Sequence, residues 1–208
     1  MKRIYMFGEG NKSQKNLLGG KGANLSEMKT MGVPVPGGYT ITTEMCTDYY
    51  KNGGKNSDEL LADMREYTAK LEKETGKEFG SSTNPLLLSV RSGARVSMPG
   101  MMDTILNLGL TTEAVAGMIE KTGNPKFVWD IYRRFIQMFG EVVQGVEYEA
   151  FDGVLEGVKE KNGYKGDLEL TATDWEFVCE QFLAIVQKET GKPFPQDPYT
   201  QLEMAVNA

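Results

Sequence analysis

Hydrophobic and polar positions along the chain predict short strands in its first half and a series of helices after residue 110. Strand patterns, in which apolar residues alternate with polar ones or form short runs, occur at residues 2–7, 38–42, 86–90 and 104–108. Apolar residues at helical spacing predict helices near residues 20–31, 43–50, 57–75, 112–122, 125–143, 151–161, 174–190 and 199–208. No convincing strand pattern follows residue 110, so the chain is predicted to be α+β with an all-helical part.

These patterns also predict which side chains face the core. In the first long helix, we expect Leu25, Met28 and Met31 to point inward. Cys46 and Cys179 lie in apolar stripes of later helices, and both are predicted to be core residues.

Two helix starts have sequence signatures. Thr43 is expected to cap the helix that carries Cys46, with Tyr49 and Tyr50 on its apolar side. Residues 173–176, Thr-Asp-Trp-Glu, have the spacing of a capping box, in which the first and fourth residues satisfy helix N–H groups reciprocally.

The helix at 125–143 is the most hydrophobic. At 100° per residue, its apolar side chains span an arc of about 200°, too wide for a lightly packed surface helix. Arg134 falls at the edge of this arc, and Arg133 well inside the polar one. Arg134 could project toward a ligand, or it could pair with Asp130 four residues earlier. The pattern alone favours the ion pair.

Residues 86–110 predict two strands joined by a loop of small residues. The first strand, Leu86 to Val90, is expected to be buried, and Arg91 and Arg95 follow it directly. Guanidinium groups present planar forks that suit phosphate oxygens, and small neighbours let a ligand approach the backbone. A hairpin with solvated arginines is the alternative interpretation.

A second candidate phosphate site is the turn Gly19-Gly20-Lys21-Gly22, which precedes a helix. A glycine turn at a helix start offers free N–H groups, and Lys21 adds a positive charge. The spacing differs from the phosphate-loop pattern GxxxxGK[ST], because Gly22 stands where Ser or Thr is needed. A capping turn with an exposed lysine remains the alternative.

Composition narrows the possible functions. The net charge of −6 argues against a general nucleic-acid or membrane-binding surface. The chain has no histidine, which excludes phosphohistidine chemistry and histidine metal ligands on this chain. The chain has only two cysteines, far apart in the sequence, which argues against a disulfide framework. Because no secretory or membrane-spanning pattern is present, we expect a cytoplasmic protein.

Three motifs carry a resemblance to a known family. The stretch SVRSGARVSMPGMMDTILNLG at 89–109, NLLGGKGANLSEM at 16–28, and GNP at 123–125 followed by YRRFIQM at 132–138 occur in this order. Together they resemble the nucleotide-binding domain of the pyruvate phosphate dikinase family. The resemblance weakens after about residue 145 and covers only the beginning of that family's much longer chain.

The resemblance implies an ATP-grasp-like fold and an organisation into lobes. Residues 1–110 would form the first lobe, with a small mixed or antiparallel sheet and with 197–208 returning to it. Residues 111–196 would form a helical insertion. The second lobe, the phosphohistidine domain and the pyruvate-binding domain would lie outside the chain.

The resemblance also implies site residues. Lys21 and Arg91 would contact the ATP phosphates and assist phosphoryl transfer. Gly100 and Met102 would contact the nucleotide through the loop backbone, and Arg134 would be a secondary phosphate contact. The ligands of Mg²⁺ are expected in the second lobe, beyond residue 208, and Asp103 is expected to cap a turn. No metal ligand is assigned to this chain.

The implied parent reaction converts ATP, phosphate and pyruvate to AMP, pyrophosphate and phosphoenolpyruvate, in a homodimer. We expect the chain to be inactive alone, with ATP, the downstream lobe and the phosphohistidine domain as its partners. One alternative is a non-catalytic module that binds nucleotide or a partner. Another is the equivalent part of a phosphoenolpyruvate synthase, against which Gly22, Gly93 and residues 97–102 speak.

Overall fold

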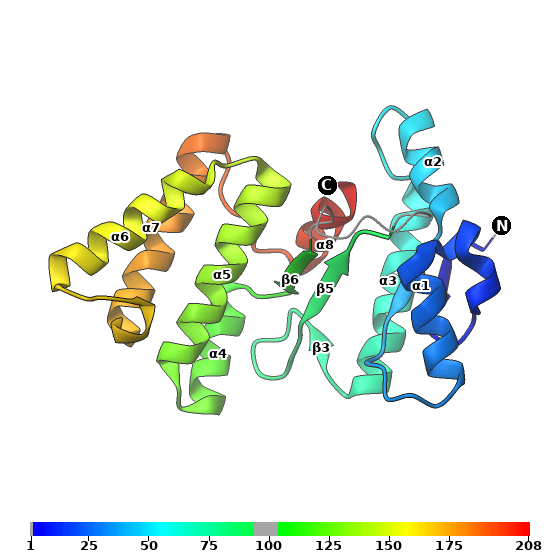
Figure 1. Cartoon of the computed structure of the whole chain (residues 1–208), viewed down its shortest axis with the longest axis horizontal. Helices are drawn as coiled ribbons and strands as arrows, with labels where there is room; N and C mark the ends of the chain where they lie inside the picture. Colours follow the sequence, from blue (N-terminus) through cyan, green and yellow to red (C-terminus); the bar gives the residue numbers. More distant parts are fainter. Residues whose placement is uncertain (1, 94–103) are drawn as a thin grey trace. The chain divides into compact units, whose positions relative to one another are not determined.

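The computed structural model describes residues 2–93 and 104–208, which form two compact units (Figure 1). The first unit contains the chain up to Glu78, the described residues of 91–104, and Asn207. The second contains Phe79–Val90, Ile105–Val206 and Ala208. Helices and small two-stranded sheets occur together, so the predicted α+β class is confirmed.

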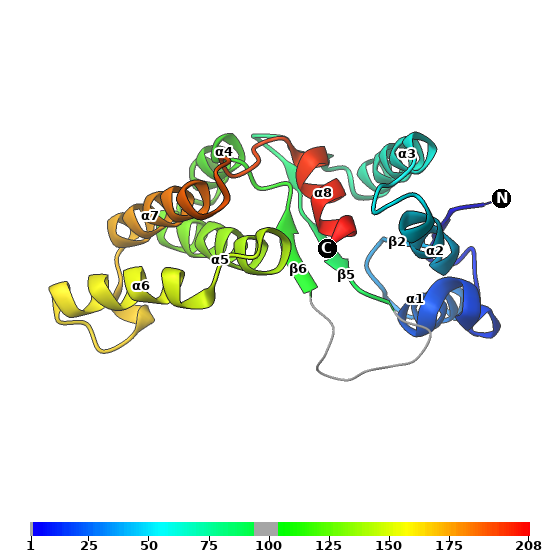
Figure 2. The same cartoon turned by 90° about the horizontal axis from the view of Figure 1, so that it is seen from above.

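The first unit is built around one antiparallel strand pair. Strand β1 (Ile4–Met6) pairs with β2 (Tyr39–Ile41), with Ile4 opposite Ile41. A 3-10 helix (Lys12–Gln14) leads into α1 (Lys15–Thr30), and α2 (Thr43–Lys51) and α3 (Asp58–Thr75) follow. Helices α1 and α3 contact this strand pair, and α1 also contacts α2 (Figure 2).

Helix α3 has the ends that its sequence predicts. The Ser57 hydroxyl accepts a hydrogen bond from the Leu60 N–H, and Gly76 ends the helix in a left-handed conformation with φ of 67°. Leu60, Met64 and Leu71 are buried along one face. This face supplies much of the unit's apolar core, in which Ile4 of β1 is only 1% exposed.

The prediction for the inward face of α1 was wrong. Met28 and Met31 are 40% and 72% exposed, while Gly22, Ala23 and Ser26 are buried. Small residues face inward because the helix comes very close to β2. A Cβ added at Gly22 would lie 2.6 Å from Cγ2 of Thr40.

The prediction for α2 also needs correction. Cys46 is exposed rather than in the core, and Tyr50 is 75% exposed. The buried residue of this helix is Met45, one position earlier, and the cap position is Thr42 rather than Thr43. One step along a helix rotates the side chain by about 100°, so this shift is enough to turn Cys46 to solvent.

Four short strands follow α3 along the chain. They are β3 (Glu78–Phe79), β4 (Pro85–Leu86), β5 (Leu88–Arg91) and β6 (Thr104–Leu108). Strand β3 pairs with β4, and β5 pairs with β6. The expected buried strand at 86–90 is therefore split at Leu87. Leu86 is buried, but β5 alternates between half-buried and exposed positions.

The helices of the second unit pack mainly through α5 and α7 (Figure 1). They are α4 (Thr112–Thr122), α5 (Pro125–Gln144), α6 (Tyr148–Asn162), a 3-10 helix (Asp167–Glu169), α7 (Ala172–Thr190) and α8 (Pro198–Asn207). Buried aromatic rings form the core: Phe135 and Phe139 both pack edge-on against Phe194, and Phe151 packs on Phe182.

The capping box of α7 lies two residues before its predicted place. The Thr171 hydroxyl accepts from the Asp174 N–H, and the Asp174 carboxylate accepts from the Thr171 N–H. Hydrogen bonds from the backbone N–H and the hydroxyl of Thr171 hold the pKa of Asp174 below its usual value, against the opposing effect of burial. Asp174 is thus the fourth residue of the box, and not its second.

Helix α8 is attached to the end of β6 by one buried glutamine. The Gln201 side-chain oxygen accepts from the Gly109 N–H at 2.9 Å, and its amide donates to the carbonyls of Leu110 and Pro195 at 2.9 and 2.8 Å. Gln201 is completely buried. These bonds fix the helix against residues that follow β6 directly.

Among the helices that the structure describes, none combines the length and apolar character needed to cross a membrane.

Candidate phosphate site

The glycine turn at residues 19–22 interrupts α1. Gly19 has φ of 68° and ψ of 170°, a conformation that essentially only glycine adopts. Regular helix continues from Gly20, so Lys21 lies near the start of the continuing helix. The predicted combination of a glycine turn with a following helix is therefore present, with a preceding helical turn that the pattern did not indicate.

The structure brings Lys21 to the residue that follows Arg91. The exposed Lys21 ammonium donates to the backbone carbonyl of Ser92 at 3.1 Å, although the two residues are 71 positions apart in the sequence. Arg91 is also exposed, at the end of β5. The structure thus brings Lys21, from one motif that the sequence singled out, to the residue that follows Arg91 in another.

The charge of these two cations is not neutralised within the described part of the chain. In residues 2–93 and 104–208, no carboxylate lies within ion-pair distance of Lys21 or Arg91. A neutral carbonyl is a weak partner for an ammonium group compared with an anion. The arrangement therefore suits an anionic ligand such as a phosphate chain. Gly100 and Met102, together with Arg95 and Asp103, lie outside the described residues.

Arg134 makes the ion pair that the pattern favoured. Its Nε donates to both carboxylate oxygens of Asp130, at 3.2 and 3.1 Å, and its side chain is 58% exposed. Arg134 and Asp130 line a cavity of about 260 Å³ in the second unit, together with Phe127 and Trp175.

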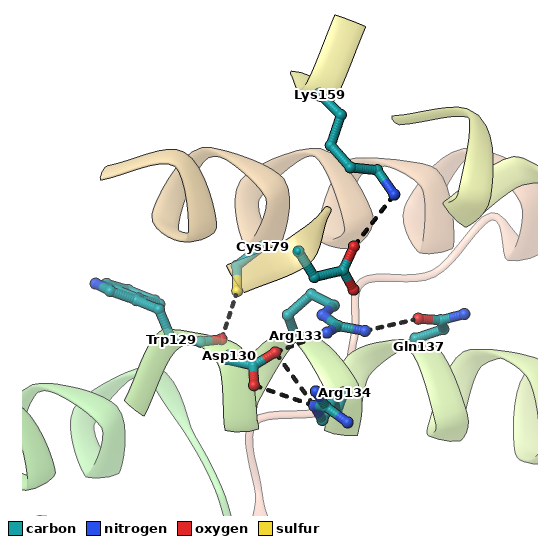
Figure 3. A network of polar contacts seen from close by, with 8 residues as sticks. Trp129, Asp130, Arg133, Arg134, Gln137, Lys159 and Cys179 are labelled. Carbon is teal, nitrogen blue, oxygen red and sulfur yellow. Dashed lines mark hydrogen bonds and ion pairs between the residues drawn. The ribbon is translucent and has the colours of Figure 1, made fainter. Parts of the chain in front are cut away.

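The sequence-based placement of Arg133 was wrong. Its side chain is only 8% exposed, although it was predicted to lie on the polar face of α5. Its guanidinium donates to Asp130 at 2.6 Å and to Gln137 at 3.3 Å (Figure 3). The guanidinium carbon also lies 4.7 Å from the ring centroid of Trp175. Packing with α7 covers this part of the polar arc, and the facing Trp175 was the one signal for it in the sequence.

Other polar groups near α5 have structural explanations. Cys179 is buried, as predicted, and its thiol donates to the carbonyl of Trp129 at 3.4 Å. Burial raises the pKa of this thiol. Burial likewise raises the pKa of the Tyr132 hydroxyl to about 12, although Gln196 donates a hydrogen bond to it. Neither group is poised to react at neutral pH.

The described side chains do not fit a metal ion by themselves. Across residues 2–93 and 104–208, no three histidine, cysteine or acidic side chains are grouped closely enough to hold one. Mg²⁺ prefers several oxygen ligands and usually binds through carboxylates together with substrate phosphates.

Comparison with known proteins supports the resemblance seen in the motifs. Residues 15–69, which include the glycine turn, match the sequence model of a family described as "Pyruvate phosphate dikinase, AMP/ATP-binding domain". Over its whole length, the chain is 50% identical to a pyruvate, phosphate dikinase of Clostridium symbiosum. The chain belongs to the pyruvate phosphate dikinase family.

Other dikinases match equally completely. The enzyme of Rhizobium meliloti (strain 1021) is 48% identical over 211 residues, and the chloroplastic enzyme of Mesembryanthemum crystallinum is 48% identical over 212 residues. In each case all of this chain is covered, but only 24% and 22% of the relative. The chain thus spans about a quarter of the length of the dikinases that it matches, and it corresponds to their N-terminal part.

Proposed function

We propose that the chain is the ATP-binding N-terminal part of a pyruvate phosphate dikinase. The parent protein would convert ATP, phosphate and pyruvate to AMP, pyrophosphate and phosphoenolpyruvate. The observation that carries the proposal is the contact of Lys21 with the Ser92 carbonyl, directly after Arg91. This contact supports one phosphate site assembled from two of the motifs shared with the dikinase family.

In this site, Lys21 and Arg91 bind the phosphate chain of ATP. Phosphoryl transfer requires alignment and neutralisation of charge on the phosphate oxygens more than covalent help from the protein. Arg91 offers a planar fork to two oxygens, and Lys21 offers a mobile point charge. Gly100 and Met102 supply backbone contacts to the nucleotide, and Arg134 is a further phosphate contact.

The rest of the reaction belongs to other parts of the parent. The chain contains no histidine, so the phosphohistidine intermediate forms elsewhere. Mg²⁺ is held by the ATP phosphates and by carboxylates of a second lobe. Residues 1–110 with 197–208 form the first ATP-grasp-like lobe, and 111–196 the helical insertion. The parent is a homodimer in the cytoplasm, and this chain alone does not complete the reaction.

A calorimetric titration series tests the proposal. The 208-residue chain is titrated with ATP, with inorganic tripolyphosphate and with adenosine, and circular dichroism verifies its folding. Because the two cations recognise the phosphate chain, ATP and tripolyphosphate should compete for one site, and adenosine should bind much more weakly. Adenosine binding as strong as that of ATP, or no binding of either phosphate compound, would refute the phosphate site.

A further inference from the structure

One carboxylate on α5 is shared by two arginines of very different burial. Oδ1 of Asp130 accepts from Nη2 of Arg133 at 2.6 Å and from Nε of Arg134 at 3.2 Å, while Oδ2 accepts from Nε of Arg134 at 3.1 Å (Figure 3). Asp130 therefore connects a buried cation with an exposed one on the same helix.

The buried partner restricts the carboxylate. Arg133 lies over the indole ring of Trp175 and also donates to Gln137, so its guanidinium is held from three sides. A buried cation needs an anionic partner, because an unpaired charge in the protein interior is strongly unfavourable. Its Nε finds no hydrogen-bond partner among the described residues, which increases its dependence on Asp130. Asp130 is thus kept in one orientation.

This fixed carboxylate determines the orientation of the Arg134 guanidinium. Asp130 occupies the Nε of Arg134, and no described residue is hydrogen-bonded to the two terminal nitrogens. These nitrogens form the edge of the guanidinium that can bind two oxygens of one phosphate. An ordinary exposed i,i+4 pair would leave both side chains mobile and would lose rotamer entropy on binding an anion.

We propose that Asp130 is a positioning residue for Arg134. It fixes the arginine by its Nε, so that the terminal nitrogens are ready to bind the polyphosphate of a nucleotide beside the cavity that both residues line. Arg133 acts indirectly, because it orients the Asp130 carboxylate. The inference rests on the proposed ATP-binding function and adds to it a residue that does not itself touch the ligand.

The first test measures the geometry without any ligand. Nitrogen-15 NMR resolves arginine Nε–H groups, and their heteronuclear relaxation reports their mobility. The Nε–H of Arg134 should be rigid in the wild-type chain and mobile in Asp130→Asn, whose amide is uncharged but retains an oxygen for Arg133. An Arg134 Nε–H that is mobile in the wild-type chain would overturn the inference.

The second test is a double-mutant cycle for ATP binding by the full chain. Asp130→Asn and Arg134→Ala should each weaken ATP binding by about tenfold, the value of one hydrogen bond to a charged group. In the Arg134→Ala background, Asp130→Asn should have no further effect, because a positioning residue acts only through Arg134. Glu66→Gln serves as the matched control, since it breaks an exposed i,i+4 pair with Lys70 on another helix.

The outcomes separate this inference from the proposed function. If the folded wild-type chain binds no ATP, both are refuted. If ATP binds but Asp130→Asn binds as well as the wild type, only the positioning role is refuted. An equal loss on Asp130→Asn with and without Arg134 would mean that Asp130 acts on the fold, and would also refute the positioning role.

Discussion

Replacing Gln201 by leucine tests how α8 is attached to the end of β6. The change keeps a side chain of similar volume but removes the three hydrogen bonds to Gly109, Leu110 and Pro195. The Gly109 N–H and the Leu110 carbonyl belong to buried residues, so water cannot easily replace the lost partner. Pro195 is only half-buried and can regain water.

The expected cost follows from the two buried backbone groups. Leaving a buried donor or acceptor unsatisfied costs about 1–3 kcal/mol each, and the added apolar surface of leucine offsets only part of this. We therefore expect Gln201→Leu to lower the free energy of unfolding of the second unit by about 3 kcal/mol. For a chain of this size, that corresponds to a fall in melting temperature of roughly 6–12 °C.

Tryptophan fluorescence is a specific assay for this unit. The chain has two tryptophans, Trp129 and Trp175, and both lie in the second unit. Urea unfolding followed by their emission should show the lower stability, whereas Gln187→Leu, an exposed glutamine on α7, should unfold within about 0.5 kcal/mol of the wild type. Equal stability of the Gln201 and Gln187 variants would refute the role assigned to the buried amide.

Three further predictions concern packing, pH and thiol reactivity. Gly22→Ala should destabilise the first unit by about 1–3 kcal/mol, because the new Cβ would meet Thr40 at 2.6 Å; a thermal melt in which it equals the wild type would contradict this. Burial raises the pKa of Tyr132 to about 12, so the unfolded chain loses this proton first. Between about pH 10 and about pH 12, this group should lower the free energy of unfolding by about 1.4 kcal/mol per pH unit, and Tyr132→Phe should remove that contribution. The exposed Cys46 should react with Ellman's reagent in the native chain, and the buried Cys179 only after unfolding. Rapid reaction of two thiols per native chain would contradict the burial of Cys179.

Much of the helical framework follows from local sequence. Ser57 and Gly76 bound α3 where their side chains and backbone conformation predict, and Gly123 ends α4 in the left-handed conformation. Pro125 begins the most hydrophobic helix, as expected for the first helical position. These signals are local, because caps depend on residues within one turn of each other, yet they misplaced the starts of α2 and α7 by one and two residues.

Burial was harder to predict because it depends on the facing element. Arg133 is polar by its position on α5, but Trp175 of another helix covers it. Met31 is apolar, yet it lies beyond the small-residue face by which α1 approaches β2. The strand pair β3–β4 was missed because each strand has only two residues, too few for a periodic pattern.

The candidate site, too, could be predicted from local sequence only in part. Generic patterns marked Lys21 and Arg91 as separate cations, and only the resemblance implied one ligand for both. Their proximity through Ser92 depends on 71 intervening positions and could not be derived from spacing. The Asp130–Arg134 pair was predictable because an i,i+4 contact is local to one helix.

Calorimetric titration of ATP into the wild-type chain and into Lys21→Ala and Arg91→Ala tests whether the two cations form one ATP site. Lys55→Ala, which removes an exposed lysine elsewhere in the first unit, is the control. We predict one ATP per wild-type chain, binding at least about tenfold weaker in each site variant, and unchanged binding in the control. Undiminished ATP binding by folded Lys21→Ala and Arg91→Ala chains would mean that these two cations do not hold the phosphates.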